Sequence, residues 1–169
     1  EKEFACIVGR SGSGKSTLLN ICAGILAASE GSILFDQKNL TTMDDQELSL
    51  LRNQSMGYIM QGYALLPNLT IEANVQLPYY MYRRSGDIRS YTYELLKAVG
   101  LKDKAHKFPG ELSGGEIRRI EIARALINKP KLIIADEPTG DLDKLTARTI
   151  MELFSQIHKN GTSILMVTH

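Results

Sequence analysis

The sequence of 169 residues has no tryptophan, only two cysteines and no apolar run long enough to span a bilayer. Its first residues also lack the charged-then-apolar layout of a secretory signal. Because 20 basic residues face 19 acidic ones, the net charge of +1 gives no general electrostatic reason to bind nucleic acid or an anionic membrane. We therefore expect a soluble, cytoplasmic protein in which any charged binding surface is a local patch.

The cysteines and the overall composition limit the possible folds. Cys6 lies in an apolar run and Cys22 in an expected helix, and neither has a metal-type spacing. We expect both to be buried small hydrophobic side chains rather than ligands or a disulfide. With 43% hydrophobic residues the chain can bury one sizeable core, which predicts one compact unit with room for an inserted lobe.

The two ends of the sequence predict a piece of a longer protein. The chain opens without methionine, almost directly on the apolar residues 4–8, and it stops at His169 right after the apolar residues 164–167. A strand of a parallel sheet normally needs cover on both faces, and no helix follows the last one. We therefore expect that flanking segments complete the domain.

The most informative stretch fits the phosphate-binding loop pattern G-x-x-x-x-G-K-[ST]. An apolar strand is expected before it and a helix from Lys15, so its glycines can turn backbone N–H groups toward a polyanion at a helix N-terminus. Lys15 would reach the β and γ phosphates, and Ser16 would offer its hydroxyl to a magnesium ion. The alternative, a Gly/Ser-rich turn that binds nothing, is less favoured between a strand and a helix. The loop predicts a nucleoside triphosphate, bound by Gly9, Arg10, Ser11, Gly12, Ser13, Gly14, Lys15, Ser16 and Thr17.

Further strands deliver polar side chains to the same edge of the expected sheet. The apolar residues 132–135 run straight into Asp136 and Glu137, so one acid can hold magnesium through water while the other polarises the attacking water. A helix-capping acid pair is the alternative. Gln61 ends an expected strand over residues 55–60 and is either a ligand-facing residue or an ordinary polar strand terminus. The last strand brings His169 to this edge.

Other segments follow simpler patterns. Residues 31–36 predict a short strand, residues 41–51 a capped surface helix, and residues 144–159 a helix with one apolar face. Residues 62–106 are mainly helical and interrupted by prolines, which indicates an insertion into the α/β core. A tyrosine and arginine cluster in this insertion could form an RNA or partner surface, but helix packing with solvated arginines is favoured over it; the cluster comprises Tyr79, Tyr80, Tyr82, Arg83 and Arg84.

A second glycine-rich turn precedes a long helical pattern. Ser113 and Glu116 have the spacing of a capping box, which is a sufficient structural reason for both. Capping does not explain Gly114 and Gly115, which weaken a first helical turn but leave its N–H groups bare for a second anion. The arginines that follow are expected on a solvated face; they are Arg118, Arg119 and Arg124.

Together these pieces resemble the nucleotide-binding domain of ATP-binding cassette (ABC) proteins. The resemblance is carried, in the family's order and over essentially the whole chain, by the Walker A loop at residues 9–17, the Q-loop Gln61, the signature L-S-G-G-E at residues 112–116, the Walker B acids Asp136 and Glu137, the D-loop at residues 140–143 and the H-loop His169. The runs L-L-P-N-L-T and D-E-P-T-G-D-L-D look like those of lipoprotein, macrolide and antimicrobial-peptide exporters.

The resemblance implies a fold, a reaction and partners. The fold would be α/β: a RecA-like P-loop NTPase core over residues 1–61 and 129–169 with a mostly parallel sheet, an inserted helical subdomain over residues 62–128, and a truncated N-terminal β lobe. Two such domains would pair head to tail, each holding ATP and Mg²⁺ between its Walker A loop and the partner's signature residues 113–116. Glu137 would be the general base, and His169 would stabilise the γ-phosphate. Gln61 would contact the magnesium ion and the attacking water. Ser16 and Asp136 would also hold the metal.

The implied role is the ATP-hydrolysing subunit of a transporter that exports a lipoprotein, peptide or drug through a membrane permease. It would sit on the cytoplasmic side of the membrane, held there by the permease, without nucleic acid. The chain departs from the family in Glu116, often glutamine, and in Met60, often aromatic. The aromatic that stacks on adenine would precede residue 1, so ATP over GTP follows from the family alone.

Three other functions compete with this one. An ATP-gated dimerisation switch on a membrane complex has the same sequence features. A chromosome-maintenance or DNA-repair ATPase shares the motifs, but it would place a long coiled coil or a zinc insertion between them, and this chain has neither heptads nor a C-x-x-C pair. A simple P-loop kinase lacks the signature run.

Overall fold

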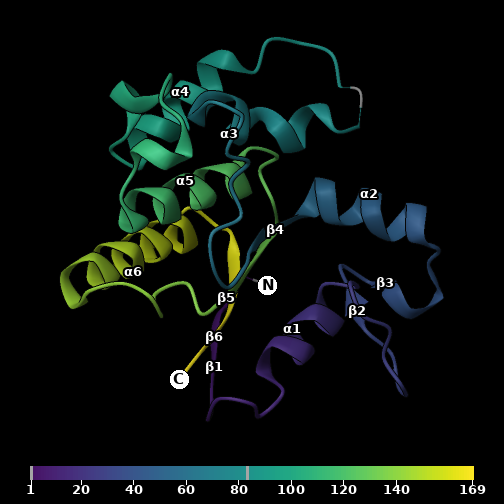
Figure 1. Ribbon diagram of the computed structural model, residues 1–169. Helices are drawn as coiled ribbons and strands as arrows, with labels where there is room; N and C mark the ends of the chain where they lie inside the picture. The colour runs from purple at the N-terminus through teal and green to yellow at the C-terminus, as the bar shows by residue number, and fades with distance from the viewer. Residues whose placement is uncertain (1, 83) are drawn as a thin grey trace.

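A four-stranded parallel sheet forms the centre of the protein (Figure 1). The computed structural model describes residues 2–82 and 84–169. The strands lie in the order β1-β6-β5-β4, and each neighbouring pair is parallel. Because parallel strands end at the same edge, the loops that follow them meet there. The mostly parallel α/β fold is therefore confirmed, with strands β1 (Phe4–Val8), β4 (Met56–Ile59), β5 (Leu132–Asp136) and β6 (Ser163–Thr168).

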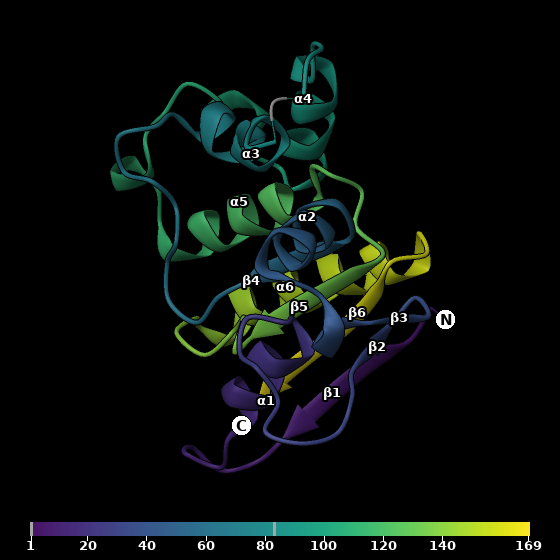
Figure 2. The same ribbon diagram turned by 90° about the vertical axis from the view of Figure 1, so that its right-hand side faces the viewer.

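Helices cover both faces of this sheet. Successive side chains of a strand point to opposite faces: in β5, Ile133 and Ala135 pack with Phe154 of α6, whereas Ile134 packs with Leu19 of α1. Figures 1 and 2 show α3 and α4 on the side of α5 away from the sheet. The helices are α1 (Lys15–Cys22), α2 (Asp45–Ser55), α3 (Ile71–Tyr80), α4 (Arg89–Ala98), α5 (Gly114–Leu126) and α6 (Lys144–Lys159), with short 3₁₀ turns at Leu40–Thr42, Lys102–Lys104 and Pro109–Glu111.

The helix α5 joins two hydrophobic cores. Its Ile120 and Ala123 pack with α3 and α4 in a helical cluster. Its Ile122 packs with β4, β5 and α6 on the sheet face that α6 covers. All three side chains are fully buried. This helix therefore carries contacts between the layer of α3 and α4 and the sheet. Within the described residues, no helix has the length and apolarity needed to cross a membrane.

The expected strand over residues 31–36 is wrong in its extent. The strand β2 covers only Leu34–Phe35 and pairs antiparallel with β3 (Lys38–Asn39) in a separate two-stranded sheet. Asp36 and Gln37 between them have φ values of 51° and 64°, the left-handed pair of a tight type I′ hairpin turn. The sequence does not signal this turn because neither position is glycine.

The expectation that both cysteines are buried is also wrong. Cys6 is exposed and Cys22 is only half-buried. Cys6 lies on β1, which pairs only with β6 among the described residues and is an edge strand there, and most of β1 is exposed. Partial burial raises the pKa of the Cys22 thiol above its ordinary value of 9.0.

Several arginines expected on a solvated face are held inside the fold. The Arg118 side chain is only 1% exposed, and Arg119 and Arg124 are half-buried and donate to the carbonyl oxygens of Val99 and Ala64. These loop carbonyls lack helical or sheet partners, so a long donor side chain satisfies them at low cost. The prediction failed because helical spacing gives no information on neighbouring loops.

The prediction for the tyrosine and arginine cluster is correct for two tyrosines and wrong for Arg84. Tyr79 and Tyr80 meet edge to face with their ring centroids 5.3 Å apart, as expected for helix packing. Arg84 is half-buried and not simply solvated, because its guanidinium donates to Asn128 Oδ1 at 2.6 Å and Asn53 Oδ1 at 3.1 Å. Arg83 lies outside the described residues.

Candidate nucleotide site

The loop between β1 and α1 has the backbone needed to hold an anion. Gly12 and Gly14 have φ values of 78° and 87°, which side chains rarely adopt. Gly14 is the N-cap of α1 and provides no capping side chain, and the first turn of the helix contains no acid. The N–H groups of this turn therefore keep their partial positive charge for a phosphate oxygen.

Lys15 is held in place by its own loop. Its Nζ donates to the carbonyl oxygens of Gly9 at 2.8 Å and Arg10 at 2.9 Å, and the residue is 8% exposed. An ammonium group has three donors, so one N–H is left for a phosphate oxygen within the described part of the chain. The position of this charge is thus set by the loop that binds the phosphates.

Ser16 and Asp136 meet between α1 and the end of β5. The Ser16 hydroxyl donates to Asp136 Oδ1 at 3.0 Å, and Asp136 is 6% exposed. A hydroxyl and a carboxylate beside a phosphate loop are the oxygen ligands that Mg²⁺ uses together with substrate phosphates. These two residues therefore fit a magnesium ion, although the described residues include no cluster of three acid, histidine or cysteine side chains that could hold a metal by themselves.

Glu137 lies at a sharp turn immediately after β5. Its φ of 44° is in the left-handed region, which is uncommon for a residue with a side chain. Its backbone N–H donates to Val167 O at 3.1 Å, which holds the turn against β6. Such strained positions cost about 1–3 kcal/mol and concentrate at functional sites. Glu137 lines the same cavity as residues of the phosphate loop and the start of α1.

Two side chains that follow other strands, Gln61 after β4 and His169 after β6, contact this carboxylate. Gln61 Nε2 donates to Glu137 Oε2 at 3.2 Å, and His169 Nδ1 lies 3.0 Å from Glu137 Oε1. The Glu137 side chain is 14% exposed, so a water molecule can still reach it. The geometry therefore favours the ligand-facing alternative for Gln61 over an ordinary strand terminus.

Nine of the predicted site residues line one cavity of about 290 Å³ at the carboxyl edge of the sheet, whereas Gly9, Arg10, Ser13 and Asp136 are not part of its lining. Residues of the β1–α1 loop and the start of α1 meet there with residues that follow β4, β5 and β6, although the extremes are more than 150 residues apart in the chain. We call this group the nucleotide cradle. It is lined by Ser11, Gly12, Gly14, Lys15, Ser16, Thr17, Gln61, Glu137 and His169.

The glycine-rich turn at residues 113–116, here called the signature turn, is not among the residues that line this cavity. It forms the expected capping box: Ser113 Oγ accepts from the Glu116 N–H at 3.4 Å, and Glu116 Oε2 accepts from the Ser113 N–H at 2.9 Å. Lys104 also donates to Glu116, and this bond, followed by those from Ser113, lowers the Glu116 pKa to about 2. The turn is therefore stabilised by its own residues and by Lys104.

Side chains from two other segments pack on the signature glycines. A Cβ at Gly114 would lie 2.1 Å from the Tyr63 hydroxyl, and a Cβ at Gly115 would lie 2.5 Å from Thr146 Cγ2. Sequence reasoning missed Tyr63 and Thr146, which have no motif of their own. It also missed the partnership of Arg118 and Glu121, although an i,i+3 pair of opposite charge beside Ile120 and Ile122 could have indicated a buried pair.

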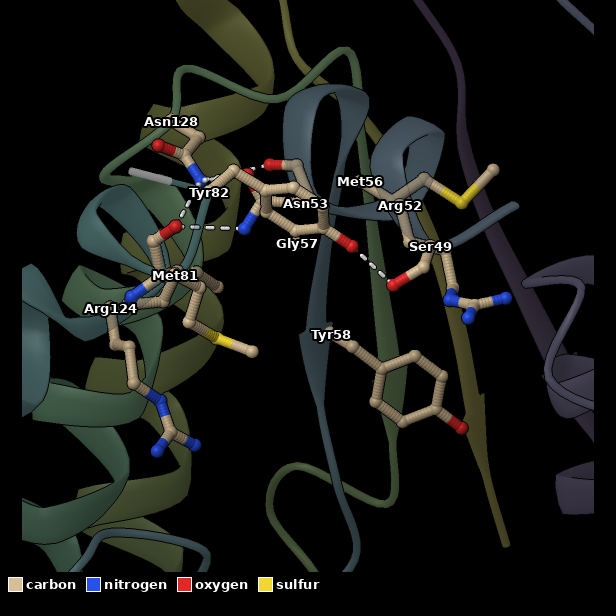
Figure 3. A pocket seen from close by; sticks show the side chains of 12 residues that line it. Ser49, Arg52, Asn53, Met56, Gly57, Tyr58, Met81, Tyr82, Arg124 and Asn128 are labelled. Atoms are coloured by element: carbon tan, nitrogen blue, oxygen red, sulfur yellow. Dashed lines mark hydrogen bonds between the residues drawn. The ribbon is translucent and has the colours of Figure 1, made fainter. Parts of the chain in front are cut away.

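A second cavity of about 250 Å³ lies between α2, β4, α3 and α5 (Figure 3). Amide groups close one end of it: Asn53 Nδ2 and Asn128 Nδ2 both donate to Pro78 O, at 2.7 Å and 3.3 Å. The hydroxyls of Ser49 and Tyr82 also hydrogen-bond across it. These bonds tie α3, and the segments that follow α3 and α5, to one another and to α2, next to the strand that leads to Gln61.

The comparisons with known proteins agree with this geometry. Residues 1–140 match a family model described as "ABC transporter". The chain is 45% identical over 168 residues to the uncharacterised ABC transporter ATP-binding protein YvrO of Bacillus subtilis, covering 99% of the chain and 73% of YvrO. It is also 45% identical over 168 residues to the lipoprotein-releasing system ATP-binding protein LolD of Aquifex aeolicus, covering 99% of the chain and 75% of LolD.

The chain is also similar to solved structures of an ABC transporter cassette. A dimeric structure of MJ0796, described as a bacterial ABC transporter cassette, matches with a TM-score of 0.91 at 40% identity and covers 100% of the chain and 75% of the cassette. A dimeric post-hydrolysis state of the same cassette bound to ADP and Pi matches with a TM-score of 0.89 and the same identity and coverage.

Proposed function

This chain belongs to the ABC transporter family as a nucleotide-binding ATPase, and from this we propose that it drives export of a lipoprotein, peptide or drug through a partner permease. The observation that carries the ATP-hydrolysing part of the proposal is the contact of Glu137 with Gln61 and His169 beside the phosphate loop. The export class is supported by the L-L-P-N-L-T and D-E-P-T-G-D-L-D runs and by the 45% identity to a lipoprotein-releasing ATP-binding protein.

In the proposed reaction the chain's own residues have separate tasks. The N–H groups of residues 9–17 and Lys15 bind the phosphates, which are held at the N-terminus of α1. Ser16, Asp136 and the amide oxygen of Gln61 would hold Mg²⁺, which would neutralise charge on the β and γ phosphates. Glu137 takes a proton from the water whose oxygen attacks the γ-phosphorus, and the bond to the β-phosphate oxygen breaks. His169 contacts the γ-phosphate.

We propose that a second copy completes this site. The signature turn is capped by Ser113 and Glu116, yet it is not among the residues that line the cavity of its own chain. A head-to-tail pair would place it over the γ-phosphate held by the other copy, where Ser113, Gly114, Gly115 and Glu116 would contact the nucleotide. The match to dimeric cassettes supports this pairing. Loss of the γ-phosphate would then open the pair.

We also propose a division of the chain into two subdomains. Residues 1–61 and 129–169 would form the P-loop ATPase core, and residues 62–128 the inserted helical subdomain with the signature turn. The helical cluster supports this division, because its buried members all lie within residues 71–127. The permease would hold the pair at the cytoplasmic face of the membrane.

Mixing two inactive variants of the full-length protein tests the shared site. Lys15→Ala disables the phosphate loop, and Ser113→Arg blocks the signature turn. In a head-to-tail pair of one copy of each, one of the two sites has both an intact loop and an intact turn. We expect each variant alone to be inactive and the mixture to regain a substantial part of the ATPase activity. If the mixture stays inactive while unmodified protein is fully active under the same mixing protocol, the two halves do not come from different copies.

A further inference from the structure

The loop that contains Gln61 is fastened to α5 by a buried ion pair. Arg118 Nη1 donates to Met60 O at 2.8 Å and to Glu121 Oε2 at 2.8 Å, and both side chains of the pair are 1% exposed. Met60 immediately precedes Gln61 in the chain. The guanidinium of Arg118 therefore fixes the backbone directly before the residue that contacts Glu137.

The same pair holds the far side of the loop. Glu121 Oε1 accepts from the Ala64 N–H at 2.6 Å, and Ala64 O accepts from Arg124 Nη1 at 2.8 Å. Between these anchors, the Tyr63 ring lies 5.5 Å from the Arg118 guanidinium carbon. Residues 60–64, here called the Q-loop segment, are thus bound along α5 at both ends and in the middle.

The stability of the fold does not by itself explain why Arg118 and Glu121 are buried as an ion pair. Burial raises the Glu121 pKa, and the bond from Ala64 and the charges of Arg118 and Arg124 only oppose that shift. Arg118 Nε has no hydrogen-bond partner among the described residues. Apolar side chains of similar size usually replace a buried ion pair with no loss of stability. The distinctive property of the pair is that it bonds to the backbone of the Q-loop segment.

We propose that Arg118 and Glu121 are positioning residues for ATP hydrolysis that keep Gln61 against Glu137. The inference rests on the proposed function. Arg118 lies on α5 two residues after the signature turn, so the pair ties the contact between Gln61 and Glu137 to the helix that would meet the other copy. A movement of α5 would shift Met60 and Ala64 together and carry Gln61 toward or away from the carboxylate.

The test compares full-length variants by steady-state ATPase kinetics. Removing one partner would leave a buried charge unpaired, so both are replaced, as Arg118→Met/Glu121→Met. We expect kcat to fall about tenfold, in the range of measured coupling effects, with KM for ATP nearly unchanged. In a Gln61→Ala background the same pair of substitutions should cause no further fall in kcat. Arg118→Lys, which still donates to Met60 O and Glu121, should retain most of the activity.

A matched control is available on α6. Arg148 Nε and Glu152 Oε1 form an i,i+4 pair at 3.0 Å with side chains 79% and 60% exposed. Arg148→Met/Glu152→Met makes the same chemical change on the surface and should leave kcat unchanged. Circular dichroism and thermal unfolding show whether each variant is folded. If Arg118→Met/Glu121→Met does not fold, Arg118→Gln/Glu121→Gln keeps polar groups at the site and is judged by the same comparison in the Gln61→Ala background.

The inference is overturned if Arg118→Met/Glu121→Met folds and its kcat is unchanged. It is also overturned if these substitutions lower kcat by the same factor in the Gln61→Ala background as in the parent protein. Failure of the proposed function gives a different result, because the unmodified protein would then lack ATPase activity that depends on Glu137. The inference alone fails when that activity is present and the Arg118 and Glu121 substitutions leave it unaffected or act independently of Gln61.

Discussion

The nucleotide cradle and the signature turn are assembled in opposite ways. The cradle joins the ends of four strands, and its contacts, such as Ser16 with Asp136 and Gln61 with Glu137, span more than 70 residues. The signature turn is closed by residues three apart, Ser113 and Glu116. The cradle therefore exists only in the folded sheet, whereas the turn needs little more than the start of its helix.

The two regions also differ in what they offer a ligand. The cradle brings charged and titratable side chains together around a cavity, with Lys15 and Glu137 on its wall. The signature turn offers backbone N–H groups, and a side chain on Gly114 or Gly115 would force Tyr63 or Thr146 to move. The nucleotide cradle has the side chains needed for a reaction, and the signature turn has a surface that a ligand or a second copy can contact. Substitutions confined to one region should therefore have separable effects.

The largest expected effect comes from Glu137→Gln in the cradle. Loss of a general base costs about 10²–10⁴-fold in rate, and the amide keeps the size of the side chain. ATP binding should persist because Lys15 and Ser16 are unchanged, so ATP should trap the pair of copies. ATPase assays and size-exclusion chromatography with ATP measure the two results. Glu152→Gln on the exposed face of α6 is the control, and undiminished turnover by Glu137→Gln would remove Glu137 from its role.

A smaller effect is expected from Gly115→Ala in the signature turn. The new Cβ would lie 2.5 Å from Thr146 Cγ2, and overpacking of this kind costs about 1–3 kcal/mol, against a gain of up to about 1 kcal/mol in helix propensity. Thr146→Ser removes Cγ2 and keeps the hydroxyl that donates to Asp143. We therefore expect Gly115→Ala/Thr146→Ser to be more stable than Gly115→Ala in urea unfolding. Equal stability of the two would show that the contact with Thr146 is not responsible.

The smallest expected effect is a pH dependence at Glu116. Its pKa is about 2 in the folded chain against an ordinary 4.5, so the folded state binds fewer protons at this carboxylate than the unfolded state. The stabilisation is complete above pH 4.5 and is lost as the pH falls toward 2. Unfolding temperatures of the parent and Glu116→Gln should therefore converge over this interval. A constant difference down to the lowest pH at which the protein folds would contradict the assignment.

Sequence reasoning predicted the local features of the site well. The strand, glycine loop and helix around Lys15 follow from residue types at fixed spacing, and so does the capping box of Ser113 and Glu116. It also placed Asp136 at the end of its strand correctly. It failed for Arg118 and Cys6, because the burial of a side chain depends on which other segments pack against it, and helical or strand periodicity does not contain that information.

By itself the sequence determined the family, the parallel α/β class and the positions of the phosphate loop and the acids, because these depend on local backbone conformation and on the order of motifs along the chain. Only the tertiary structure decided that Glu137 turns back to meet Gln61 and His169, and that Arg118 and Glu121 are buried against the Q-loop segment. The physical reason is that these contacts join residues far apart in the chain, and their distances depend on how the strands and α5 pack.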